Sequence, residues 1–124
     1  MKFVKLWLPV VIWAGLIFYL SSIPNLKTNL EYDYFLRKLA HIIEYFIFAA
    51  LFYRAFKGSF KVGPFRLFMY PAVFSLLYAI SDEIHQYFVL GRNCAMQDVL
   101  IDSLGIICFF VFIKTKKGHL CLTK

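Results

Sequence analysis

The residues best suited to chemistry lie in one short segment, residues 79–92, with the sequence AISDEIHQYFVLGR. It places Asp82, Glu83, His85 and Gln86 directly after the apolar run FMYPAVFSLLYAI. Neighbouring carboxylates perturb each other's pKa, and histidine titrates near neutral pH, so these residues offer partners for general acid–base catalysis. On a helix the four side chains would share one broad face.

Two further polar stripes recur at the i, i+3 and i+4 spacing that places side chains on one face of a helix. The stripes are Lys38, His41, Glu44 and Tyr45, and then Asp98, Asp102 and Gly105. If all three segments are helical and side by side, their ionisable groups lie at a similar level. The spacing therefore predicts one polar cluster assembled from three helices.

The elements that would hold this cluster are four apolar runs in a chain of 124 residues, of which 61% are hydrophobic and 17% charged. The runs are Phe3–Ser21, Leu36–Phe56, Arg66–Phe88 and Gln97–Ile113. Each is close to the ~20 residues that cross a bilayer as a helix. We predict an all-α, four-transmembrane-helix bundle forming a single domain, residues 1–124. The first run is expected to be retained, because no Ala-x-Ala cleavage pattern follows it.

The basic residues predict the orientation of the bundle. Four spans place both termini and the 57–65 loop on one side, and ten of the fourteen basic residues lie there. These ten are Lys2, Lys5, Arg54, Lys57, Lys61, Arg66, Lys114, Lys116, Lys117 and Lys124. The positive-inside rule therefore places both termini in the cytoplasm. Because topology accounts for the net charge of +7, no nucleic-acid partner is needed.

The cost of ionisable groups in a membrane predicts where the three stripes face. An Asp at a helix centre costs roughly 2.5–3.5 kcal/mol on insertion scales, so the stripes should face the bundle interior or a cavity open to the outer face. Such a network can also serve only to hold helices together, with interhelical hydrogen bonds averaging about 0.6 kcal/mol. The number of polar groups at one level favours a binding or catalytic cavity.

The first functional hypothesis is an enzyme acting from the outer face on a lipid-linked or cell-wall substrate. The candidate catalytic residues are His41, Asp82, Glu83 and His85. The candidate substrate-binding residues are Lys38, Glu44, Gln86, Arg92, Asp98 and Asp102. Lys38 and Arg92 would hold an anionic group such as phosphate. Ser21, Ser22 and Ser81 are weaker candidates for a nucleophile.

Three alternatives remain open beside this hypothesis. The pairs His41-x-x-Glu44 and Asp82-x-x-His85 resemble those of di-metal helical bundles, although no metal ligand is assigned and the cofactor is unknown. A non-catalytic protein could use the same pocket to bind an envelope component or to organise another membrane protein. Proton-coupled transport is less favoured, because no acidic group continues the path inward. The three cysteines do not have the spacing of metal ligands or of a disulfide framework. The sequence leaves the oligomeric state open, and a homo-oligomer is one of the possible states.

The chain resembles the VanZ-like family of small bacterial membrane proteins along nearly its whole length. The matching stretches are SSIP (21–24), KLAHIIEY (38–45), SDEIHQ (81–86), Gly91-Arg92, Asp98 and Gly105. The resemblance implies a multi-pass protein of the bacterial inner (cytoplasmic) membrane. The family's founding member is associated with reduced susceptibility to the glycopeptide teicoplanin. The family commonly has Asn where this chain has Asp102, which weakens any role that requires a charge there.

Overall fold

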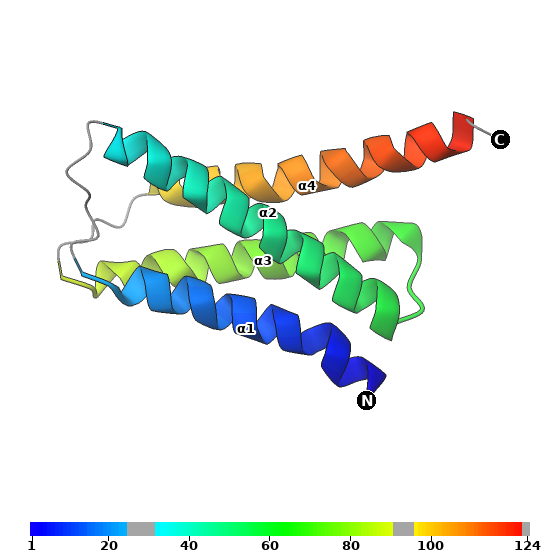
Figure 1. The fold of residues 1–124 in the computed structure, drawn as a ribbon, viewed down its shortest axis with the longest axis horizontal. Helices are drawn as coiled ribbons and strands as arrows, with labels where there is room; N and C mark the ends of the chain where they lie inside the picture. Colours follow the sequence, from blue (N-terminus) through cyan, green and yellow to red (C-terminus); the bar gives the residue numbers. More distant parts are fainter. Residues whose placement is uncertain (25–31, 91–95, 123–124) are drawn as a thin grey trace.

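The computed structural model describes residues 1–24, 32–90 and 96–122, with side chains described as far as Lys116. These residues form four α-helices and no strand. The helices are α1 (Lys2–Ser22), α2 (Asp33–Ser59), α3 (Pro64–Tyr87) and α4 (Met96–Leu122). Helix α2 lies across the bundle and packs against each of the other three (Figure 1). The predicted all-α, four-helix architecture is confirmed.

All four helices are long and apolar enough to cross a membrane. In each one, at most 33% of the most apolar 18-residue window is buried inside the bundle. Most large apolar side chains therefore point outwards, an arrangement that is stable where the surrounding solvent is lipid. The chain is built as a multi-pass membrane protein.

Helices α1, α2 and α4 extend beyond the predicted apolar runs at both ends, whereas α3 begins two residues before its run and ends one residue before the end of it. Helix α2 begins at Asp33, whose carboxylate forms an ion pair with Arg37, one turn along the helix, at 3.1 Å between Oδ2 and Nε. The acid in the first turn also complements the helix dipole. Between α2 and α3, Phe60 is extended and Pro64 occupies the first turn of α3, where its missing N–H costs nothing.

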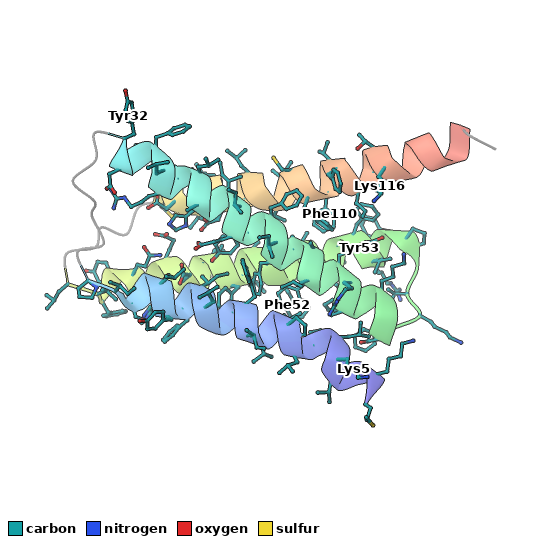
Figure 2. All side chains as sticks on the ribbon, viewed as in Figure 1. Lys5, Tyr32, Phe52, Tyr53, Phe110 and Lys116 are labelled. Carbon is teal, nitrogen blue, oxygen red and sulfur yellow. The ribbon has the colours of Figure 1, made fainter. Side chains whose placement is uncertain are left out.

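The start of α1, the α2–α3 connection and the C-terminal end of α4 lie together at the right of Figure 1. We call this the basic end. Its described cations are Lys2, Lys5, Arg54, Lys57, Lys61, Arg66, Lys114 and Lys116. Figure 2 shows Lys5 and Lys116 toward this end and Tyr32 at the opposite one. The termini thus lie at the same end of the bundle, as an even number of spans requires.

Aromatic rings fill the half of the bundle next to the basic end. We call this group, with members from all four helices, the aromatic half. It comprises Trp7, Phe52, Tyr53, Phe56, Phe68, Phe74, Phe109 and Phe110. Ring centroids lie 5.4 Å apart for Trp7 and Phe56 and 5.4 Å apart for Phe68 and Phe110. Helix association here rests on dispersion between rings.

Candidate functional site

The polar face of α3 is turned into the bundle. Asp82 and Glu83 are each 3% exposed, and Gln86 is 2% exposed. Gln86 Nε2 donates to Asp82 Oδ2 at 2.9 Å and to Ser21 Oγ of α1 at 3.3 Å. The i, i+4 spacing places the amide and the carboxylate one above the other, so the helix itself creates the first of these bonds.

His41 and Asp102 join α2 to α4 at the same level. His41 Nδ1 lies 2.9 Å from Asp102 Oδ1, and Asp102 is completely buried. The close approach depends on Gly105, one turn further along α4. A Cβ atom at Gly105 would lie 2.3 Å from the backbone oxygen of Ile42, so only glycine fits against α2 here. Gly105 thus lets α4 approach α2 closely enough for Asp102, three residues earlier on α4, to reach His41.

The bond to Asp102 also determines which ring nitrogen of His41 acts as the donor. A carboxylate only accepts hydrogen bonds, so Nδ1 of His41 donates to it, and in the neutral ring Nε2 is then left as the acceptor. The His41 side chain is 17% exposed, whereas that of Asp102 is fully covered. A histidine oriented in this way by a buried carboxylate has the arrangement of a general base.

Lys38 is the cation of this end that the structure places beside the carboxylates. Its ammonium forms an ion pair with Asp98 in the first turn of α4. The same nitrogen lies 5.0 Å from the ring centroid of Tyr34. It also interacts electrostatically with Glu83 of α3. The pair links α2 to α4 a turn away from the His41–Asp102 bond.

His85 turns toward α1. Its Nε2 lies 2.9 Å from Ser22 Oγ, and its ring stacks on Phe18 with centroids 4.3 Å apart. The Ser22 hydroxyl donates to the backbone oxygen of Phe18 at 2.7 Å, so it accepts its bond from His85 Nε2–H. The histidine therefore holds this serine without activating it as a nucleophile. Ser81 is exposed, and its hydroxyl donates to the backbone oxygen of Tyr78.

These contacts belong to one cluster, because the charges interact across the helices. Asp82 of α3 interacts electrostatically with His41 and Tyr45 of α2 and with Asp102 of α4. We call the group the polar cluster. Its members are Ser21 and Ser22 of α1, Lys38, His41, Glu44 and Tyr45 of α2, Asp82, Glu83, His85 and Gln86 of α3, and Asp98 and Asp102 of α4.

The hypothesis of a di-metal site depends on convergence of the two histidine–carboxylate pairs. In the structure, the ring of His41 contacts Asp102 and the ring of His85 contacts Ser22. Within residues 1–24, 32–90 and 96–122, no group of three or more His, Cys, Asp or Glu side chains is arranged to hold a metal ion. The geometry of these residues gives the di-metal variant no support.

The structure brings nine of the ten candidate residues into or beside the cluster, and Arg92 lies outside the described residues. Glu44 is half-buried, interacts electrostatically with His41, and accepts from Trp13 Nε1 through its backbone oxygen. Sequence reasoning built the polar cluster from the second, third and fourth helices and gave Ser21 and Ser22 only as weaker candidates for a nucleophile. In the structure both serines of α1 are bonded to side chains of α3. The Ser-Ser dipeptide at the end of the first apolar run was the signal for this contribution.

Comparison with protein families adds an independent finding. The family model described as VanZ/LLP1 matches residues 6–117, nearly the whole chain. The chain belongs to the VanZ/LLP1 family. The matched segment includes every residue of the polar cluster, and it confirms the resemblance that the sequence motifs indicated.

No curated protein and no solved structure matches this VanZ/LLP1 chain. In this family member, the geometry of the site therefore indicates the roles of individual residues. That geometry is a set of carboxylates, histidines and one lysine, held between four membrane-spanning helices at the end opposite the basic end.

Proposed function

We propose that this VanZ/LLP1 protein lies in the bacterial inner membrane with both termini in the cytoplasm and the polar cluster toward the outer face. There it acts on a lipid-linked or cell-wall component of the envelope, and it lowers susceptibility to glycopeptides such as teicoplanin. The basic end supports this orientation through the positive-inside rule. The family supports the connection to the envelope.

The observation that carries the proposal is the His41–Asp102 pair. A histidine whose Nδ1 is held by a buried carboxylate presents Nε2 as a base, and His41 keeps partial exposure while Asp102 is covered. Glu83 and Asp82 supply further proton-handling groups from α3. Lys38, with Arg92 of the following segment, is proposed to hold the anionic part of the substrate.

A second candidate function, a non-catalytic binder, is favoured by a different observation. The Ser22 hydroxyl and the Gln86 amide are already bonded within the bundle, so neither is free to attack or to orient a substrate. On this account the cluster recognises an envelope component, or organises another membrane protein, and performs no reaction.

Expression in a glycopeptide-susceptible bacterial host tests the proposal. The wild-type protein should raise the minimum inhibitory concentration of teicoplanin. His41→Gln, Glu83→Gln and His85→Asn should abolish that rise while immunoblots show unchanged protein levels. A general base contributes about 10²–10⁴-fold to a rate, so for an enzyme the variants lose turnover and keep ligand binding. For a binder, affinity and resistance fall together.

The matched control is Asp33→Asn. Its carboxylate lies at the same end of the bundle and pairs with Arg37 on its own helix. This variant should retain the wild-type susceptibility. An unchanged inhibitory concentration with wild-type protein, or full resistance in all three cluster variants, would refute the proposed function.

A further inference from the structure

The charges of the basic end are all of one sign. Within residues 1–24, 32–90 and 96–122, the carboxylates lie toward the opposite end, in the first half of α2, the last two turns of α3 and the first two turns of α4. They are Asp33, Glu44, Asp82, Glu83, Asp98 and Asp102. Like charges gathered at one end of a molecule repel each other. The described part of the chain therefore supplies the basic end with cations and with no carboxylate to offset them.

Two of these cations meet where α1 and α2 pack together. Arg54 Nη2 of α2 donates to the backbone oxygen of Lys5 of α1 at 3.2 Å, so the guanidinium lies against residue 5. Lys57 follows Arg54 by three residues, on the same face of α2. All three side chains are exposed. A guanidinium carries five N–H donors and an ammonium three, so one oxyanion placed here can accept bonds from both helices.

An apolar strip leads away from these cations along α1. Leu8 and Ile12 follow Lys5 at the i+3 and i+7 spacing of one helix face, and they are 51% and 61% exposed. Further along, Trp13 Nε1 donates to the backbone oxygen of Glu44, so α1 and α2 stay in contact from the basic end inwards. Exposed apolar side chains on a membrane-spanning helix face acyl chains. The surface thus fits a ligand with an anionic head and an apolar tail better than a nucleic acid or an acidic peptide.

We propose that Lys5, Arg54 and Lys57 bind the phosphate of an anionic phospholipid, whose acyl chains lie along Leu8 and Ile12. Basic residues at the end of membrane-spanning helices attract anionic headgroups, and a guanidinium binds phosphate through two parallel hydrogen bonds. A zwitterionic headgroup brings no net charge, so it should bind more weakly. The lipid site lies at the end opposite the polar cluster, goes beyond the proposed function and does not depend on it.

Quenching of tryptophan fluorescence by brominated acyl chains tests the site in the wild-type protein. Both tryptophans, Trp7 and Trp13, lie on α1 beside the proposed path of the acyl chains. The purified protein is titrated in mixed micelles with brominated phosphatidylglycerol or with brominated phosphatidylcholine. We expect saturable quenching at a lower fraction of phosphatidylglycerol than of phosphatidylcholine. Unbrominated phosphatidylglycerol should reverse the quenching, and soluble glycerol phosphate should not.

Substitutions of the basic residues locate the site. Lys5→Gln and Arg54→Gln should each weaken the affinity for phosphatidylglycerol about fivefold, the effect of losing a contact worth about 1 kcal/mol. Lys116→Gln is the matched control, because it removes the same charge at the same end, from α4 (Figure 2). Within the described part of the chain, α4 does not contact α1. This variant should bind the lipid as the wild-type protein does.

Three results would each overturn the lipid site. Equal quenching of the wild-type protein by the two brominated lipids would mean that the headgroup charge is not recognised. A loss of affinity in Lys116→Gln as large as that in Lys5→Gln would mean that only the diffuse charge of the basic end attracts the lipid. Reversal of the quenching by glycerol phosphate would identify a site for soluble phosphate esters. The comparison of lipids on the wild-type protein holds even if a variant fails to fold.

Discussion

The two halves of the bundle are held together by different forces. In the aromatic half the helices meet through rings, such as Phe56 against Phe74 with centroids 5.7 Å apart. In the opposite half most of the buried side chains are polar, among them Asp102, Asp82 and Gln86. Both halves have large apolar side chains on their outer surface. Among the described residues, the buried carboxylates, which are the most expensive side chains to bury, lie in the polar half.

This difference indicates which half is constrained by function. Between helices in a membrane, close packing supplies most of the association energy, and polar contacts average about 0.6 kcal/mol. Rings alone would therefore suffice to join these helices. Burying several carboxylates in the other half costs stability, and such costs are typical of sites that bind or react. The predictions below probe the polar half, from the largest expected effect to the smallest.

Gly105→Ala should produce the largest loss of stability. The new Cβ atom would meet the backbone oxygen of Ile42 at 2.3 Å, and a backbone atom cannot rotate away as a side chain can. Helices α2 and α4 must separate, so we expect a loss of about 3 kcal/mol or more in the free energy of unfolding. Thermal unfolding in detergent measures it, and a cooperative transition at the wild-type midpoint would refute this packing.

Gly15→Ala is the matched control for this substitution. No atom lies within 4 Å of the place where its Cβ would stand on α1. Alanine is the better helix former by up to about 1 kcal/mol, so this variant should be as stable as the wild type or slightly more stable. The difference in stability between the Gly105→Ala and Gly15→Ala variants isolates the contribution of the α2–α4 contact.

Asp102→Ala should have an intermediate effect, and Asp102→Asn a small one. Alanine leaves Nδ1 of His41 without its acceptor and should cost about 1–3 kcal/mol. Asparagine keeps an oxygen in place of Oδ1, so we expect a loss below about 1 kcal/mol. Chemical denaturation of both variants measures the difference. Equal losses would mean that the His41 bond does not stabilise the bundle.

The sequence was sufficient to predict the four helices and the level of the polar groups. Apolar runs of span length define helices because a helix is the conformation in which a single segment satisfies its own backbone hydrogen bonds in lipid. The i, i+3 and i+4 spacing was sufficient to place Lys38, His41 and Glu44 on one face and Asp98 and Asp102 on another. Both results follow from the geometry of a single helix.

The pairing between helices did not follow from the sequence. Periodicity gives the direction of a side chain around its own helix, but not the rotation or axial offset of a neighbour. The bond from His41 to Asp102 and that from His85 to Ser22 depend on those offsets. Likewise, Gly105 was visible as part of a stripe, while its contact with the α2 backbone required the packed structure.

The unfolding midpoint of Asp82→Asn tests most directly whether the polar half is kept for function at a cost to stability. Asparagine retains an oxygen for the Gln86 amide and removes the buried charge. We predict a midpoint equal to or above that of the wild-type protein. A midpoint lower by more than about 4 °C, roughly 1 kcal/mol for a chain of this size, would show that the charge of Asp82 stabilises the bundle and would contradict the account.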